Sequence, residues 1–572
     1  MKHLRSSIAF ALATLFSTAA DALARPQTTT PLVLGPNGAA LNNGNSTSYS
    51  PTLSADGRLV VFSSSSDHVV PGITNPAGAP QIYLLDAQSA VTQLVSATST
   101  GAPCNGWCED AAISDDGSTI AFVSDATDLP SLPNAGGRQV LVYDVATGLL
   151  SRASIALNGA LPNGDSFDPV LSGNGRFVAF TSRASNLVVG DTNGLHDVFL
   201  RDRVLGTTEW ISAPRLGGVA GDSVLASISR DGALVAFQSD ASNLVPNDLP
   251  LTDDIFLLDR AHGTFRAVNR TPGGALSNGA SRLPRLSQDG QWLVFQSDST
   301  DLVPGDNNGA VDVFAHSLIG QVTFRISQNF QGAAPAGVSD LGFPSSDGRF
   351  IVYRSTASDI VSGDTNALAD VFLHDVLSGR TELVSVSTAG AQGNFSSDFP
   401  QVDSTGRKVI FQSRSSTLAG PVAPNTTNIL VRDRGCVVTG YCSATSSGAG
   451  CNAAILGSGT PSTTPGSSFH ITASGLPRER SAALVWSLAP TGVPFAGGLL
   501  CVQPPLRRTM PSFTAGSGGP ACGGTFAFDF SATYIAAQGL WAGQAVFCQI
   551  LCRDAGGSSL AFSGALNFVI CP

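Results

Sequence analysis

One loop sequence that could bind a metal ion occurs three times in the chain. Each copy places an aspartate, an asparagine two residues later and a second aspartate four residues after that. Carboxylate and amide oxygens are the ligands that calcium prefers, and the ion takes about six to eight of them. The three copies are Asp191, Asn193 and Asp197; Asp306, Asn308 and Asp312; and Asp364, Asn366 and Asp370.

The same residues also suit a turn that holds no metal. No glutamate that could bind calcium through both oxygens follows these loops. Aspartate and asparagine side chains also bond to their own backbone in turns. Two alternatives therefore stay open, bound calcium and a purely structural turn, and the sequence favours the turn. No other cofactor is required by any motif.

The segment "PCNGWC" is a second candidate site. Cys104 and Cys108 stand apart from the other eight cysteines, which all lie between Cys436 and Cys571. An even number of cysteines in an exported chain favours disulfides, with zinc the weaker alternative, so Cys104 and Cys108 are predicted to pair. Trp107 between them could be a binding contact or could fold onto its own loop. No catalytic residue is predicted, because G-x-S-x-G and H-E-x-x-H are both missing from the sequence.

Composition and the N-terminal residues narrow the class of protein. The chain has 572 residues, a net charge of −11 and two lysines, Lys2 and Lys408, which argues against nucleic-acid binding. Residues 1–24 carry Lys2 and Arg5 ahead of an apolar stretch, with small residues before a cleavage point after Ala24. This pattern predicts a signal peptide and an exported protein, periplasmic or extracellular. No later segment is long and apolar enough to predict a membrane span.

An internal repeat must position these residues. A turn followed by an apolar run, as in "SADGRLVVF" and "SGNGRFVAF", recurs at intervals of 57 to 60 residues. Asp-Gly and Asn-Gly supply the positive φ of tight hairpin turns, and each unit contains four strand-like runs. Four strands joined as a meander form one blade of a β-propeller. The turn glycines are Gly57, Gly117, Gly175, Gly232, Gly290, Gly348 and Gly406.

The chain ends suggest that the repeats close into a ring. The seventh unit stops after its third strand at "NILVRDRG", and the segment from Thr29 matches the missing fourth strand. We therefore expect an all-β fold, with a seven-bladed propeller over residues 30–435 that an N-terminal strand closes. Residues 436–572 are rich in Ser, Thr, Gly and Cys with short apolar runs, which predicts a disulfide-rich β-sandwich.

The repeat motifs S-x-D-G-x-x-(V/I)-(A/V)-F and D-(V/I)-F-(L/A) resemble the TolB-like, or PD40 (WD40-like), propeller repeats of exported bacterial proteins. The last 137 residues are similar to an uncharacterised domain of secreted bacterial proteins. The resemblance implies a scaffold, a binding platform or part of an enzyme.

The expected function is non-enzymatic binding or scaffolding of a protein, peptide or glycan ligand on a propeller face. The alternative is a carbohydrate-active lyase or hydrolase with its site in the propeller channel. Convergent, unpaired charged side chains at one mouth of that channel would favour the enzyme.

Overall fold

The computed structural model describes residues 27–32, 48–67, 69–130, 137–248, 252–419, 427–435, 438–441, 453–459, 461–463, 469–495, 498–515, 522, 524–540, 544–553 and 560–570. The predicted signal peptide lies outside these residues. Two compact units divide the chain, one over Gln27–Asp433 and one containing Arg434–Pro572. Among the described residues, no helix has the length and apolar character needed to cross a membrane.

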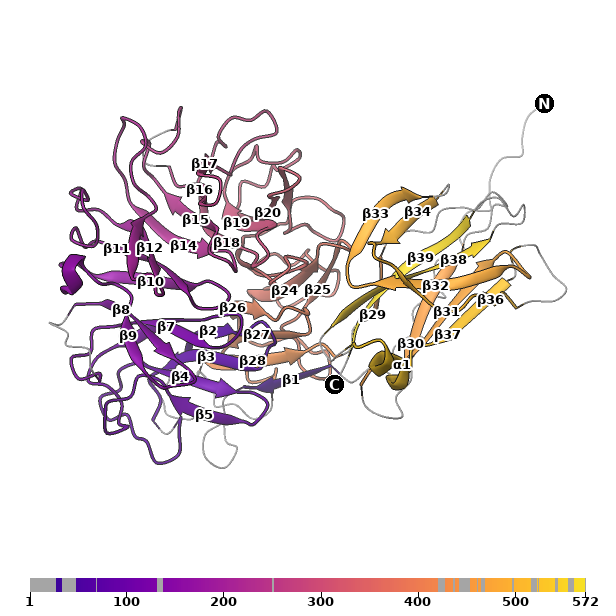
Figure 1. Cartoon of the computed structure of the whole chain (residues 1–572), viewed down its shortest axis with the longest axis horizontal. Coiled ribbons are helices and arrows are strands. Elements are labelled where there is room, and N and C mark those ends of the chain that lie inside the picture. The colour runs from indigo at the N-terminus through magenta and orange to yellow at the C-terminus, as the bar shows by residue number, and fades with distance from the viewer. Residues whose placement is uncertain are drawn as a thin grey trace. The chain divides into compact units, whose positions relative to one another are not determined.

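Seven four-stranded antiparallel sheets form the first unit (Figure 1). Sheets 1 to 3 contain β2 (Ser48–Leu53), β3 (Leu59–Ser64), β4 (Gln81–Asp86) and β5 (Val91–Leu94); β6 (Cys108–Ile113), β7 (Thr119–Ser124), β8 (Gln139–Asp144) and β9 (Leu150–Arg152); and β10 (Ser166–Leu171), β11 (Phe177–Ser182), β12 (Asp197–Asp202) and β13 (Thr207–Trp210). Sheets 4 and 5 contain β14 (Ser223–Ile228), β15 (Leu234–Ser239), β16 (Asp254–Asp259) and β17 (Thr264–Ala267); and β18 (Ser281–Leu286), β19 (Trp292–Ser297), β20 (Asp312–Ser317) and β21 (Val322–Arg325).

Sheet 6 contains β22 (Ser339–Pro344), β23 (Phe350–Ser355), β24 (Asp370–Asp375) and β25 (Arg380–Leu383). Sheet 7 contains β26 (Ser397–Val402), β27 (Lys408–Ser413) and β28 (Asn428–Asp433), and its fourth strand is β1 (Thr28–Pro31) from the other end of the unit. Thr28 pairs with Asp433 and Pro31 with Leu430. This pairing is the one that the N-terminal sequence predicts.

The sheets follow one another in a closed circuit. The first strand of each sheet contacts the first strand of the next, and β26 of sheet 7 contacts β2 of sheet 1. Second strands are buried on both faces, as their unbroken apolar sequences predict; all six residues of β11 are buried. Apolar side chains of neighbouring sheets pack together, for example Phe177 and Val198 of sheet 3 with Phe237 and Phe256 of sheet 4. The arrangement is that of a β-propeller.

The predicted hairpin turns are confirmed by the backbone. All seven turn glycines have positive φ, between 66° and 73°. A side chain at this φ would be strained, and at Gly348 an added Cβ would lie 2.3 Å from the indole of Trp292 on the neighbouring sheet. The turns therefore require glycine both for backbone conformation and for close packing of adjacent sheets.

The second unit is also built from strands around an apolar core. One sheet has the order β29 (Val438–Tyr441), β39 (Leu560–Val569), β38 (Ala545–Arg553), β32 (Ser481–Ser487) and β35 (Arg507–Arg508), with β36 (Ser512–Phe513) also on β32. A second sheet joins β30 (Ala454–Gly459), β31 (Phe469–Leu476) and β37 (Gly524–Asp529), and a third joins β33 (Pro490–Phe495) and β34 (Gly498–Val502). Side chains of the first two sheets, including Phe469, Trp486 and Phe568, share one core with Ile535 of the short helix α1 (Ala532–Ala537).

The cysteines of this unit differ from one another. Cys501 and Cys522 are each disulfide-bonded, whereas Cys548 is a buried free thiol. Burial in the apolar core raises the pKa of Cys548. Cys436, Cys442, Cys451 and Cys571 lie outside the described residues. The described part of the unit thus contains both bonded cysteines and a free one.

Candidate binding site in the central channel

The first strand of each sheet lines the centre of the first unit, and a bulge interrupts the strand. In six of the sheets the bulge holds a residue other than glycine at a positive φ of 49° to 55°. An L-residue in this conformation costs roughly 1–2 kcal/mol. Such strained positions concentrate at functional sites, where the surrounding structure holds them in place. The six residues are Asp110, Asp168, Leu225, Leu283, Leu341 and Phe399.

Side chains from the preceding sheet help to hold the bulges. The backbone N–H of Leu283 donates to Gln238 Oε1 at 3.2 Å, and that of Leu341 donates to Gln296 Oε1 at the same distance. In sheet 4 the N–H of Leu225 donates to Thr181 Oγ1 at 3.3 Å. The bulge is therefore a product of the ring, because its backbone donor is satisfied by the neighbouring sheet.

A hollow of about 350 Å³ lies between the first strands. Most of its lining is aliphatic or proline, and the two aromatic lining residues are Phe343 and Phe399. Two residues after each bulge position, one side chain per sheet borders the hollow, and its type differs in every sheet. These residues are Thr52, Ala112, Val170, Ser227, Arg285, Phe343 and Gln401.

Three charged side chains of this hollow interact. Arg285 is half-buried, and its guanidinium carbon lies 4.9 Å from the centre of the Phe343 ring. Burial lowers the pKa of Arg285, while the carboxylate of Asp168 opposes that shift. Burial likewise raises the pKa of Asp168, and the pKa of Asp110 is raised by burial and by the charge of Asp168. Folding therefore desolvates the Arg285 guanidinium and the carboxyl groups of Asp110 and Asp168, and a third carboxyl group of the lining, Asp115, lies at the other end of the hollow.

Polar contacts narrow the other end of the hollow. Asp115 Oδ2 pairs with Arg230 Nη2 at 2.6 Å and accepts a bond from Ser346 Oγ at 3.5 Å, joining sheets 2, 4 and 6. Backbone hydrogen bonds also run around this end from sheet to sheet, between Ser404 and Ala55, Ala55 and Asp115, Asp116 and Gly173, Gly173 and Arg230, Arg230 and Gln288, and Asp289 and Ser346. A ligand would consequently enter from the bulge end, beside Asp110 and Asp168.

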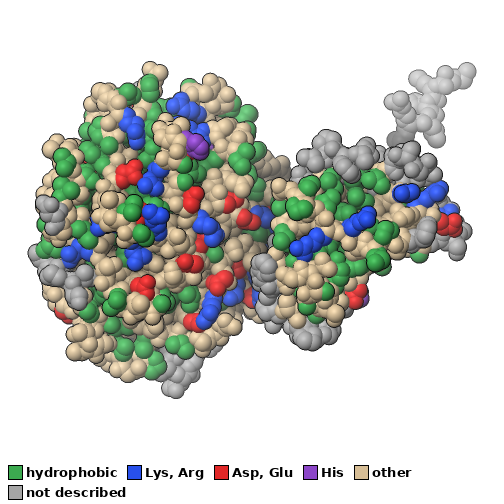
Figure 2. Space-filling view, viewed as in Figure 1, with side chains coloured by type: hydrophobic (Ala, Val, Ile, Leu, Met, Phe, Trp, Pro, Cys, Tyr) green, Lys and Arg blue, Asp and Glu red, His purple; other side chains and the backbone are tan. Residues whose placement is uncertain are grey.

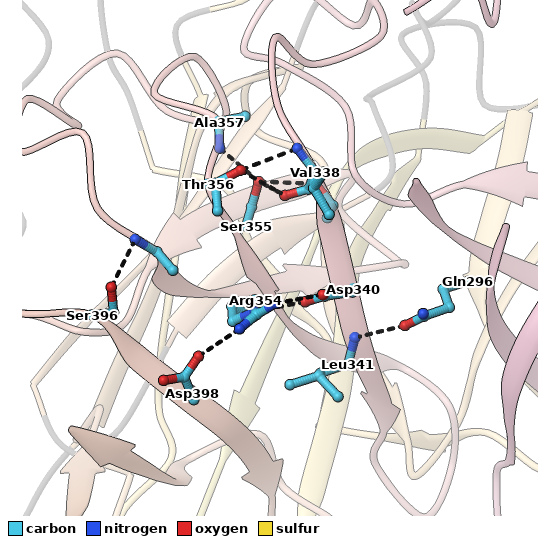
Figure 3. A network of polar contacts seen from close by, with 12 residues as sticks. Gln296, Val338, Asp340, Leu341, Arg354, Ser355, Thr356, Ala357, Ser396 and Asp398 are labelled. Atoms are coloured by element: carbon cyan, nitrogen blue, oxygen red, sulfur yellow. Dashed lines mark hydrogen bonds and ion pairs between the residues drawn. The ribbon is translucent and has the colours of Figure 1, made fainter. Parts of the chain in front are cut away.

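Ion pairs connect neighbouring sheets around this entrance. Arg354 of β23 donates from Nε to Asp340 of β22 at 2.7 Å and from Nη1 to Asp398 of β26 at 2.8 Å (Figure 3). Arg282 Nε similarly reaches Asp253 Oδ2 at 2.6 Å, linking sheets 5 and 4. These arginines are ion-paired with the carboxylates at the entrance. The charged groups left to contact a ligand are therefore those inside the hollow.

The three predicted acidic loops lie at the bulge end of the sheets but outside the hollow, ahead of the third strands. Their last aspartates, Asp197, Asp312 and Asp370, are buried and each accepts a bond from a serine of its own sheet, at 2.6, 2.7 and 2.5 Å. In two copies the asparagine also donates to the last aspartate, from Asn193 to Asp197 at 2.9 Å and from Asn308 to Asp312 at 3.0 Å. No group of three or more acidic, histidine or cysteine side chains suited to a metal occurs among the described residues.

Cys104 and Cys108 also lie at the bulge end, ahead of Asp110. Both are buried, and their sulfur atoms are 2.9 Å apart as adjacent thiols. Cys108 occupies the place that serine has in sheets 3 to 7, where Ser166, for example, bonds to Ser182; Cys108 Sγ contacts Ser124 Oγ at 3.2 Å. The disulfide between the two remains a prediction. Trp107 is 53% exposed, so its ring is available to a partner, and its binding role also remains a prediction.

The charged channel residues were missed in the sequence. Asp110 and Asp168 lie at bulges that no turn motif in the sequence predicts. Arg285 follows a leucine and a proline in an ordinary strand sequence. A signal exists nonetheless. When the repeats are aligned on their turn glycines, the position five residues earlier differs in every unit, whereas flanking positions repeat.

On the face drawn in Figure 2, basic and acidic side chains are interspersed. No protein-family model matches the chain, and neither does any curated protein. Among solved structures, a putative TolB from Agrobacterium tumefaciens is 16% identical, with 62% of this chain and 97% of that one covered and a TM-score of 0.34. A puromycin-hydrolyzing peptidase of Mycobacterium tuberculosis is 11% identical, covering 79% and 64% at a TM-score of 0.41. The GH74 xyloglucanase of Xanthomonas campestris is also 11% identical, covering 79% and 60% at 0.36. Likenesses at this level transfer no site residue to this chain.

Proposed function

We propose that this chain is an exported, non-enzymatic seven-bladed β-propeller protein that binds a short peptide segment in its central channel. The observation that carries the proposal is the hollow itself, in which Arg285, Asp110 and Asp168 converge among aliphatic walls. These residue types are not shared by the equivalent positions of the other sheets. Arg285 lies on the ring of positions that differs in every sheet, whereas Asp110 and Asp168 lie at the bulge position, which is leucine in sheets 4 to 6. Positions that build a repeat recur, so these departures point to a ligand.

A peptide fits this lining better than a glycan. Apolar side chains can bury against the leucines and valines of the channel, a carboxylate can pair with Arg285, and an amino group can pair with Asp110 or Asp168. Phe343 already stacks on Arg285, which holds the guanidinium in place for a bidentate contact. A glycan would require more hydrogen-bonding groups than this mostly aliphatic lining offers. It would also require broader aromatic faces than the two phenylalanines provide.

The test selects peptides from a random display library on the full oxidised chain and measures their affinity by fluorescence polarisation. Arg285→Gln and Asp168→Asn should each weaken the selected peptide roughly ten-fold or more, since hydrogen bonds to charged groups contribute about 1.5–3 kcal/mol. Arg58→Gln is the matched control, because Arg58 is exposed, pairs with Asp86 and does not line the hollow. This variant should bind as the unaltered chain does. Equal binding by all three variants would disprove the channel site.

A carbohydrate-active enzyme is the second candidate, because Asp110 and Asp168 are two carboxyl groups with raised pKa that converge at one mouth of the channel, as an enzyme would require. It ranks second because the charge of Arg285 offsets that of Asp168, so the converging charges are not unpaired. A pair of carboxyl groups is what glycoside hydrolysis uses. Release of reducing ends from a panel of polysaccharides, lost in both Asp110→Asn and Asp168→Asn, would replace peptide binding with this function.

A further inference from the structure

The three acidic loops differ in what faces their carboxylates. The third strand of each sheet pairs with the fourth, and the same pairing position is filled by Trp210 in sheet 3, Arg325 in sheet 5 and Leu383 in sheet 6. Their partners Phe199, Phe314 and Phe372 occupy equivalent positions. One loop thus faces an indole, one a guanidinium and one an aliphatic side chain.

In sheets 3 and 5 a side chain of the fourth strand contacts a carboxylate of the loop. Trp210 Nε1 donates to Asp197 Oδ1 at 2.8 Å, while Asn193 donates to the other oxygen. Arg325 Nη1 lies 3.2 Å from Asp306 Oδ1, and both side chains are almost completely buried. Sheet 5 therefore shows that a positive group fits beside the first aspartate of this loop.

Sheet 6 has no such group. Asp364 is 7% exposed and Asp370 is fully buried. Among the described residues, Asp364 Oδ1 and Asp370 Oδ2 have no hydrogen-bond partner. The oxygens of Asp306 in sheet 5 also accept no hydrogen bond, but Asp306 is ion-paired with Arg325. Asn366 donates to Gly393 O at 3.2 Å, as Asn308 does to Pro335 O at 3.1 Å in sheet 5. Isolated buried carboxylates are costly unless a cation or a proton compensates them.

We propose that the loop of sheet 6 binds one calcium ion through Asp364 and Asp370, and that Arg325 takes the place of this ion in sheet 5. Two carboxylate oxygens supply hard ligands and two negative charges, and backbone carbonyls and water complete such sites. Calcium sites in extracellular modules have dissociation constants of roughly 0.1–1 mM, which suits an exported protein. Calcium at this loop is independent of the channel ligand.

The two sheets provide reciprocal variants for the test. Bound metal is measured by equilibrium dialysis of the full chain against calcium, followed by elemental analysis. Leu383→Arg places a guanidinium opposite Asp364 and should lower the stoichiometry by one ion per chain. Arg325→Leu removes the internal cation of sheet 5 and should raise it by one. Asp364→Asn, a smaller change, should also lower it by one.

The calcium stoichiometries of the same variants also show whether the proposal is wrong. An unaltered chain that binds no calcium, or a stoichiometry that Leu383→Arg and Asp364→Asn both leave unchanged, overturns it. Dialysis against magnesium and against sodium is run in parallel, and retention of either in preference to calcium overturns the assignment of the ion. Circular dichroism of every variant identifies any loss of fold, and the milder Asp364→Asn keeps the test decisive if Leu383→Arg does not fold.

Discussion

Two positions a few residues apart in each first strand differ in how well their residue type is repeated from sheet to sheet. One is the start of the strand and the other follows its bulge. At the start, sheets 3 to 7 keep one serine that bonds to a serine of the second strand, as Ser339 does with Ser355 at 2.9 Å. After the bulge, sheets 4 to 6 present Ser227, Arg285 and Phe343 to the hollow. The repeated position links strands within a sheet, whereas the divergent position borders the hollow and contacts neighbouring sheets, as where Ser227 Oγ accepts a bond from the N–H of Leu286 at 2.8 Å. Repetition here marks architecture, and its loss marks the candidate site.

Deleting β1, residues 28–31, tests the architectural side and should have the largest effect. It exposes the edge of β28 and removes the buried bond from Arg432 Nη1 to Thr29 Oγ1 as well as the strand pairing. At about 1 kcal/mol for each hydrogen bond lost, the free energy of unfolding should fall by roughly 4 kcal/mol. Denaturant unfolding measures the change, and an unaltered midpoint would show that the ring does not depend on its closing strand.

The buried carboxyl group of Asp115, at the end of the channel away from the bulges, should make the stability of the ring depend on pH. Burial raises the pKa of this carboxyl to about 6 despite Arg230, above its ordinary value of 3.8. The folded chain therefore holds the proton more tightly, so this contribution to stability is full below about pH 4 and is lost as pH rises through 6.

Across that interval the unaltered chain should lose about 3 kcal/mol relative to Asp115→Asn, at about 1.36 kcal/mol per pH unit. Urea unfolding at a series of pH values measures the difference. Parallel curves for the two proteins would mean that burial of Asp115 has little energetic effect.

Arg285→Met tests the divergent position and should have the smallest effect on stability. Burial disfavours the charge of Arg285, so a methionine of similar length should leave the free energy of unfolding unchanged or raise it by about 1 kcal/mol. The same variant should lose the selected peptide. A marked loss of stability would instead make Arg285 an architectural residue.

The sequence predicts the features that rest on local rules. Asp-Gly and Asn-Gly turns require positive φ, so Gly57 and its six equivalents could be placed, and the unpaired segment near Thr29 could be matched to its sheet. The bulges are different, because the backbone N–H of Leu283, a residue with positive φ, bonds to Gln238 of the preceding sheet, a contact that no local sequence rule describes. The roles of Arg325 and Leu383 likewise could not be predicted, because they depend on the carboxylates that these residues face across a sheet.

Hydrogen exchange of the full chain, measured with and without the selected peptide, shows directly whether the peptide binds in the channel. We expect slower exchange in the first strands that line the channel, over residues 108–115, 166–173 and 281–288, with the acidic loop over 186–197 unchanged. Protection confined to that outer loop, with the first strands exchanging as before, would contradict the assignment of the channel as the binding site.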